Sequence, residues 1–168
     1  RLLDKVEGSV LWLANCNQRA KRNLKSEAES RGVDPSRLII AQRLSTEEHL
    51  ARHRLADLFL DTINFNAHST ACDALWAGLP IITKKGEQFV ARCASSFLNA
   101  IELPELITST EKEYEDLALE LATNKTLLSS ITKKLADNRL STPLFNTEQY
   151  TKNLEVAYEK VYWSEPNF

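Results

Sequence analysis

The sequence predicts an α/β protein built on a doubly wound, mostly parallel, Rossmann-like sheet. Short apolar runs of strand length alternate repeatedly with segments whose apolar residues recur at helical spacing. The predicted strands are apolar along their whole length, which is typical of parallel strands that helices cover on both faces. In sheets of this kind, ligands bind beyond the carboxyl ends of the strands, so the loops at that edge are the first candidates for a functional site.

The first half of the chain supplies two pairs of strand and helix. The helix after the first strand ends at Gly32, because glycine commonly terminates helices. Ser45 and Glu48 have the spacing of a capping box, which predicts the start of the second helix, and Thr110 and Glu113 repeat this spacing later. Strands are predicted at residues 9–14 and 37–41, and helices at 15–31 and 45–56.

The second half continues this alternation and then becomes helical. Strands are predicted at residues 58–61 and 81–83, and the helix between them begins at Ser69 and ends near Gly78, which Pro80 follows. The last predicted helix carries an apolar stripe. A short edge strand at 102–107 and helices at 88–100, 110–124, 125–138 and 147–163 complete one domain over residues 1–168, whose C-terminal helical segment covers 110–168.

Composition excludes several classes of protein. Lysine and arginine total 21 against 23 for aspartate and glutamate, and the net charge of −2 argues against a general nucleic-acid or anionic-membrane surface. No apolar run approaches the roughly 20 residues that span a bilayer, and the start lacks the apolar core of a signal peptide. The three cysteines share no CxxC spacing, which favours a reducing compartment and small core residues over disulfides or zinc. We therefore expect a cytoplasmic protein.

Motifs of several large enzyme classes are absent from the sequence. The four glycines form no GxGxxG fingerprint, which disfavours a nicotinamide-dependent oxidoreductase. No GxxxxGK[ST] segment of a P-loop enzyme occurs, and no GxSxG turn of a hydrolase. The chain also contains no methionine, so we expect it to be a piece of a longer protein.

The segment 66–80 is the strongest candidate for a binding site. A helix that opens directly after a strand directs unpaired backbone N–H groups and a partial positive charge at one point, which suits a phosphate. Ser69 and Thr70 add hydroxyl donors, and His68 adds a ring N–H. Asp73 shares the helix face of Ser69 and Thr70, where it is placed to accept ribose hydroxyls. The alternative is an ordinary helix cap without a ligand.

A second cluster lies at the same edge of the predicted sheet. His49 and Arg52 are three residues apart on the helix after the second strand and so project from one face. An imidazole there would stack on a nucleobase, and a guanidinium would bond its carbonyl edge. The alternative is a solvated helix in which Glu48 and Arg52 form an ion pair worth roughly 0.2–0.5 kcal/mol.

Together, these segments resemble one known family. In order and spacing, the sequence is similar to the C-terminal catalytic lobe of the O-linked N-acetylglucosamine transferase and SPINDLY family, which are glycosyltransferases with tetratricopeptide (TPR) repeats. The resemblance covers nearly the whole chain. The motifs that carry it are Glu-Glu-His-Leu-Ala-Arg (47–52), Leu-Ala-Asp-Leu-Phe-Leu-Asp-Thr (55–62), the segment 66–80, and Ser-Thr-Pro-Leu-Phe-Asn-Thr (141–147).

The resemblance implies the C-terminal half of a GT-B fold and a role for each site residue. It implies that His68, Ser69 and Thr70 contact the diphosphate of a nucleotide sugar and stabilise it as the leaving group. It implies that Asp73 contacts the ribose and that His49 and Arg52 contact uracil. The loop with Leu44 and Thr46 matches the base-reading loop of the family, although Thr46 stands where the animal enzymes carry lysine.

The resemblance also implies an activity. Members of the family transfer a sugar to serine or threonine hydroxyls of proteins with inversion and without a metal or other cofactor, and UDP-N-acetylglucosamine is the expected donor. The N-terminal catalytic lobe, a phosphate-contacting lysine and the TPR array would lie outside this chain, which supplies no general base. We therefore expect nucleotide-sugar binding without transferase activity from these residues alone. Alternatives are a GDP-fucose-using SPINDLY-type lobe, another GT-B enzyme, or a non-enzymatic module that binds nucleotide sugars.

Overall fold

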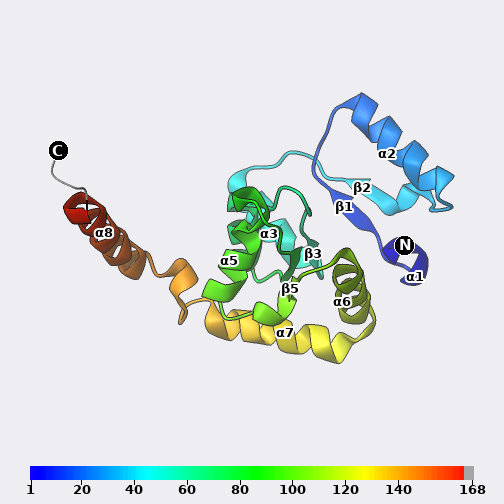
Figure 1. The fold of residues 1–168 in the computed structure, drawn as a ribbon. Helices are drawn as coiled ribbons and strands as arrows, with labels where there is room; N and C mark the ends of the chain where they lie inside the picture. Colours follow the sequence, from blue (N-terminus) through cyan, green and yellow to red (C-terminus); the bar gives the residue numbers. More distant parts are fainter. Residues whose placement is uncertain (165–168) are drawn as a thin grey trace.

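The computed structural model describes residues 1–164 and has the predicted α/β class with parallel strands (Figure 1). Every strand pair is parallel. The hydrogen bonds form two sheets, because β1 pairs with β2 while β4 lies between β3 and β5, so the single continuous sheet expected from sequence is divided. The strands are β1 (Leu11–Leu13), β2 (Leu38–Ile40), β3 (Phe59–Leu60), β4 (Ile81–Lys84) and β5 (Ile107–Thr108).

The helices follow the predicted order, and both predicted capping boxes are present. In each box, Ser45 with Glu48 and Thr110 with Glu113, the hydroxyl accepts from the glutamate amide and the carboxylate accepts from the capping residue. These reciprocal bonds satisfy amides that a helix start leaves free. The helices are α1 (Leu2–Lys5), α2 (Gln18–Ser30), α3 (Thr46–Arg52), α4 (Ser69–Ala77), α5 (Cys93–Ala100), α6 (Glu111–Thr123), α7 (Lys125–Asn138) and α8 (Thr147–Ser164).

Several predicted elements are shorter than expected, and three of them end or begin in a 3₁₀ turn. The helix expected through residue 56 leaves α geometry after Arg52 and ends in a 3₁₀ turn at His53–Leu55. The helix expected from residue 88 begins as a 3₁₀ turn at Phe89–Ala91, where the Ala91 carbonyl accepts the Gly86 amide, and α5 starts only afterwards. The edge strand expected over 102–107 is reduced to β5, because Glu102 has a left-handed φ of 59° and a 3₁₀ turn at Pro104–Leu106 precedes the strand.

The core surrounds β4. Helices α4, α5 and α6 pack against this strand, and α7 packs against α6. Side chains from all of these elements are almost fully buried, which is the expected result of apolar burial. They include Ile81, Ile82, Leu75, Leu98, Leu121 and Leu135.

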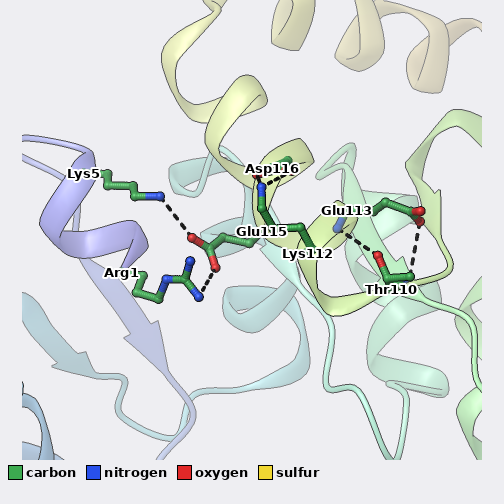
Figure 2. Close-up of polar contacts among 7 residues, drawn as sticks. All are labelled: Arg1, Lys5, Thr110, Lys112, Glu113, Glu115 and Asp116. Carbon is green, nitrogen blue, oxygen red and sulfur yellow. Dashed lines mark hydrogen bonds and ion pairs between the residues drawn. The ribbon is translucent and has the colours of Figure 1, made fainter.

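The part formed by α1, β1, β2 and α2 is tied to α6 by charges. Figure 2 shows the Glu115 carboxylate between Arg1, with a nitrogen–oxygen distance of 2.9 Å, and Lys5, at 3.1 Å. The Glu115 side chain is only 15% exposed, so this contact is better shielded than the surface pair of Lys112 and Asp116. The ion pairs hold α1 beside α6.

Helix α8 projects from the remainder of the molecule (Figure 1). All of its residues are exposed, so the predicted apolar stripe lies on a helix that packs into no core of this chain. The three cysteines are free and half-buried, which corrects the expectation that they are core residues. Among residues 1–164, no helix combines the length and the apolar character that crossing a bilayer requires.

Candidate functional site

Two junctions between a strand and a helix meet at one place. Helix α3 follows the carboxyl end of β2, α4 follows the carboxyl end of β3, and the two helices pack against each other. The charge of Asp73 on α4 acts on the pKa of His49 on α3, so the two predicted clusters are close in space. The structure therefore brings together the two clusters that lie 20 residues apart in the sequence.

The start of α4 is open toward solvent. His68 occupies the N-cap position but its side chain makes no capping bond. The amides of Ala71 and Cys72 donate to the His68 carbonyl at 3.0 and 3.2 Å, whereas amides at the preceding positions of a helix have no acceptor within it. Ser69 and Thr70 are exposed helical residues, so the capping alternative does not account for their hydroxyls. This helix end can receive an anion.

His68 lies between two aromatic rings. The Phe65 ring stacks on the imidazole with centroids 5.1 Å apart, and the Phe89 ring meets it edge-on at 6.4 Å. Phe65 and Phe89 are 61% and 73% exposed, which is unusual for large apolar side chains. They form an apolar wall beside the open end of α4.

The loop before His68 is held by a buried carboxylate. Asp61, which follows β3, is 5% exposed and accepts the amides of Thr62 at 2.9 Å and Ala67 at 2.7 Å. Its other oxygen accepts the Thr83 hydroxyl at 2.6 Å. Burial raises the pKa of Asp61, although these hydrogen bonds and the nearby His68 oppose the rise.

Arg52 has partners that the sequence did not indicate. Its Nη1 donates to the Gln42 carbonyl at 2.6 Å, and its guanidinium lies 5.9 Å from the centre of the Trp12 ring. Glu48 is engaged in the capping box with Ser45. The alternative of an ion pair between Glu48 and Arg52 is therefore wrong.

His49 is placed in a partly apolar setting. Burial lowers the pKa of its imidazole, the positive charges of Arg52 and His53 lower it further, and Asp73 opposes them. The ring meets that of His53 edge-on with centroids 4.6 Å apart. The lowered pKa favours the neutral imidazole, which can stack on a base without the cost of burying a charge.

The loop that is predicted to read the base lies between β2 and α3. Leu44 is 41% exposed, and Thr46 is the exposed first residue of α3. The structure places both beside the capping box of Ser45, and no hydrogen bond described in residues 1–164 joins them to the α4 turn. Their predicted contact with a base remains a prediction.

Buried polar atoms without partners concentrate in this region. Within the described residues, four buried side-chain atoms lack a hydrogen-bond partner, and three of them belong to His49, Asn66 and His68. Such atoms are rare in folded proteins because leaving them unpaired is costly. The carboxyl edge of the strands therefore has unused hydrogen-bonding capacity, as expected of a binding site. The fourth atom is Nε of Arg139, at the opposite edge, where a cavity of about 450 Å³ lies between Asp57, Gly78 and Arg139.

Sequence reasoning missed four residues of the site. Trp12, Phe65 and Phe89 resemble ordinary apolar residues in the sequence, and only their exposure beside Arg52 and His68 distinguishes them. The sequence contained one signal that could have identified Asp61, because a carboxylate at the end of an apolar strand is uncommon.

The chain is similar to several known proteins over most of its length. Residues 1–154 match the family described as Glycosyl transferase family 41. The chain is 38% identical over 162 residues to a probable UDP-N-acetylglucosamine peptide N-acetylglucosaminyltransferase SEC of Arabidopsis thaliana, a match that covers 96% of this chain. It is 36% identical over 155 residues, 92% of the chain, to a UDP-N-acetylglucosamine peptide N-acetylglucosaminyltransferase of Caenorhabditis elegans. A probable SPINDLY protein of Petunia hybrida is 30% identical over 143 residues, 84% of the chain.

A solved structure has the same fold. A mutant of the Thermobaculum terrenum O-GlcNAc transferase superposes with a TM-score of 0.89 and 28% sequence identity over 95% of this chain. The chain spans 31% of that solved chain, and 17%, 14% and 15% of the three relatives. The matched region is therefore a small part of each larger protein.

Proposed function

Because the chain belongs to glycosyltransferase family 41, we propose that it forms the donor-binding lobe of a transferase that attaches a sugar to serine or threonine hydroxyls of proteins. The donor is UDP-N-acetylglucosamine. The acceptor protein, the N-terminal catalytic lobe and the TPR array are contributed from outside residues 1–168. The 168 residues alone bind the donor and have no transferase activity.

The open start of α4 is the observation that carries this proposal. Its first-turn amides, the exposed hydroxyls of Ser69 and Thr70, and the positive end of the helix dipole all favour a diphosphate. His68, whose buried Nε2 has no partner in the described structure, adds a ring donor after a small movement. Asp73 lies one turn further along α4, where the ribose of a nucleotide bound at the helix start would be.

The cluster on α3 supports recognition of the base. His49 has a buried Nδ1 without a partner within residues 1–164. Arg52 is held by Gln42 and Trp12, with the remainder of its donor fork available. Leu44 and Thr46 lie just before His49 in the sequence, at the start of the same helix. A stacked imidazole and a fixed guanidinium favour a pyrimidine with carbonyl groups, such as uracil.

The choice of UDP over GDP is supported by the relatives. The Arabidopsis thaliana SEC and Caenorhabditis elegans proteins, at 38% and 36% identity, and the SPINDLY proteins, at 26–30%, all carry names with UDP-N-acetylglucosamine as the donor. The sequence departs from the animal family pattern at Thr46, so the test includes both nucleotides.

In the proposed reaction, the acceptor oxygen bonds to the anomeric carbon with inversion while the bond from that carbon to UDP breaks, and the hydroxyl proton passes to a base outside residues 1–168. Donors that are already directed at the phosphates stabilise the negative charge that develops on the leaving group, so no metal is required. Removal of one such donor, as in Thr70→Ala, is expected to cost about 2–4 kcal/mol in the transition state of the complete enzyme. We propose metal independence on this basis, and activity that survives excess EDTA in the complete protein would support it.

Calorimetric titration of the chain tests the proposal. UDP, UDP-N-acetylglucosamine, GDP and GDP-fucose, together with the nucleoside uridine, are compared on the wild type, on Thr70→Ala and on Arg52→Ala. Thr70→Ala is expected to weaken UDP more than uridine, and Arg52→Ala is expected to weaken both. The matched controls are Thr151→Ala, an exposed hydroxyl on α8, and Arg54→Ala, an exposed arginine two residues from Arg52.

The outcomes are distinct. Selective UDP binding that both site variants weaken and both controls retain supports the donor lobe. Selective GDP binding would instead favour the GDP-fucose alternative. Equal losses in the site variants and in the controls would reject these residues as the site, and no binding of any of the four nucleotides would reject donor binding by this chain.

A further inference from the structure

Asp61 is an unusual carboxylate because the donors that hydrogen-bond to it are all neutral. It is 5% exposed and receives hydrogen bonds from the Thr62 amide, the Ala67 amide and the Thr83 hydroxyl at 2.9, 2.7 and 2.6 Å. A buried charge without a cation is costly unless hydrogen bonds compensate it. An apolar or amide residue would avoid this cost, so the carboxylate has a specific role.

The first carboxylate oxygen, Oδ1, closes the loop that leads into α4. The two amides that it accepts belong to Thr62 and Ala67, at the two ends of this loop, and Ala67 directly precedes His68. Asn66, which is 1% exposed, adds a bond from its side chain to the Thr62 carbonyl at 2.9 Å. The backbone amide of Asn66 donates to the Val90 carbonyl at 2.8 Å. The chain direction at His68 is therefore fixed through Oδ1.

The second oxygen, Oδ2, connects this loop to the sheet. It accepts from Thr83 on β4, and the Thr108 hydroxyl on β5 donates to the Thr83 carbonyl at 3.0 Å. Tyr114 on α6 donates its hydroxyl to the Asp61 carbonyl at 2.9 Å. These bonds join the ends of three strands and one helix, all buried or partly buried, where hydrogen bonds are strong and geometrically restrictive.

We propose that Asp61 is a positioning residue for the diphosphate site: its carboxylate sets the place and direction of the α4 start, and so determines how tightly the diphosphate of a nucleotide is bound. Asp61 is behind the loop and does not contact the nucleotide. This inference rests on the proposed function, because it assigns the diphosphate to the α4 start. It predicts that the diphosphate contribution to affinity depends on Asp61, while the contribution of the base does not.

The ratio of two affinities separates positioning from a general loss of structure. UDP and uridine share the base and ribose, and only UDP carries the diphosphate. Asp61→Ala is expected to weaken UDP by about tenfold or more, equivalent to about 1.4 kcal/mol, and uridine by less than about twofold. Asp61→Asn, in which the amide oxygen accepts the two N–H groups and Thr83 turns its hydroxyl to accept, is expected to weaken UDP by a smaller factor.

Two further variants guard against a simple folding defect. Thr83→Val keeps the shape of the side chain and the Oδ1 bonds but removes the bond to Oδ2, and it is expected to lower UDP affinity in the same selective manner. Asp57→Asn makes the same chemical change as Asp61→Asn at an exposed aspartate before β3, and both affinities should remain at the wild-type value. Thermal unfolding identifies variants that fail to fold.

Amide hydrogen exchange needs no ligand, so it tests the inference separately from the proposed function. Amide hydrogen exchange at Ala67 is expected to be at least about tenfold faster in Asp61→Ala and faster in Thr83→Val, because the protecting acceptor is lost or loosened. A selective loss of UDP affinity together with faster exchange supports the positioning role. An unchanged UDP-to-uridine ratio in folded Asp61→Ala and Thr83→Val overturns it.

If the wild-type chain binds neither ligand, the proposed donor site fails, and exchange then decides the structural claim on its own. Unchanged exchange at Ala67 in folded Asp61→Ala would overturn the claim that this carboxylate holds the α4 start. Faster exchange at Ala67 would support the claim that the Asp61 carboxylate holds the α4 start.

Discussion

The ring of Phe65 stacks on the ring of His68 at 5.1 Å, with the two planes 19° from parallel. Phe65 belongs to the loop that Asp61 closes, and His68 begins the helix that this loop leads into. The orientation of the imidazole is therefore set by an exposed side chain three residues away. This arrangement connects the geometry of the loop to the imidazole that we propose as a ring donor to a phosphate.

Removal of the Phe65 ring should loosen His68. Aromatic pairs of this kind contribute about 0.5–1.5 kcal/mol beyond burial, so Phe65→Ala is expected to reduce UDP affinity by about two- to tenfold. Tyr158→Ala, which removes an exposed ring on α8, is the control and should change neither UDP affinity nor the NMR signals of His68. If the His68 signals keep their wild-type positions in Phe65→Ala, the ring does not orient the imidazole.

Trp12 should act on base recognition through Arg52. A cation–π contact contributes about 0.5–1 kcal/mol at exposed sites and more when desolvated, so Trp12→Leu is expected to weaken uridine by about two- to fivefold. The chain has a second such pair, Trp76 with Arg139 at 5.5 Å, on another part of the surface. Trp76→Leu is therefore a matched control, and calorimetry should find its uridine affinity unchanged. Equal losses in the two variants would contradict a specific role for Trp12.

Local chemistry made much of the fold predictable. The capping boxes at Ser45 and Thr110 depend on residues three apart, and the helix over 125–138 was predicted with the bounds that the structure has. The two clusters at the carboxyl edge were predictable because parallel strands direct their following loops to one side of a sheet. Both predictions use short-range sequence and a general rule of topology.

The parts that were not predictable depend on tertiary contacts. Asp61 meets Thr83 across 22 residues, and no pattern in the sequence marks these two as partners. Arg52 contacts Gln42 and Trp12 and not Glu48. Glu48 is bonded to Ser45 in the capping box, and the Trp12 ring of β1 lies close to the guanidinium. The division of the sheet between β2 and β3 likewise depends on hydrogen-bond geometry that apolar periodicity does not contain.

The lowered pKa of His49 should appear as a pH dependence of stability. An imidazole whose pKa is lower in the folded protein than its ordinary value of 6.5 binds protons less well when folded. Its contribution to the free energy of unfolding is therefore present above pH 6.5 and is lost as the pH falls below that value. Between about pH 7 and pH 5, the wild type should lose more stability than His49→Gln, as measured by urea unfolding.

An NMR titration gives an independent check of the same shift. The His49 resonance should titrate with a midpoint below about 6.5, the value of an unperturbed imidazole. Asp73→Asn removes the one nearby charge that opposes the shift and should lower the midpoint further. A His49 midpoint at or above the unperturbed value would contradict the neutral state that we assign to this ring.

Replacement of Gly86 should destabilise the protein because of a close approach to Ala91. A Cβ atom added at Gly86 would lie 2.6 Å from the Ala91 Cβ, a distance at which one backbone must move. The Gly86 amide also donates to the Ala91 carbonyl at 2.8 Å, so the clash would strain the bond that closes this loop. The loop carries Phe89, which lies against His68. Gly86→Ala is expected to destabilise the protein by about 1–3 kcal/mol, as overpacking commonly does.

A compensating substitution tests whether the contact with Ala91 causes the loss of stability in Gly86→Ala. Removal of the Ala91 methyl group in Gly86→Ala/Ala91→Gly eliminates the pair of Cβ atoms that clash, so the double variant should recover most of the stability that Gly86→Ala loses. The single variant Ala91→Gly, which empties a buried position, sets the cost of that change alone. Urea unfolding of the four proteins gives the coupling energy, which should be clearly favourable. Additive losses would mean that Gly86 is required for some reason other than its contact with Ala91.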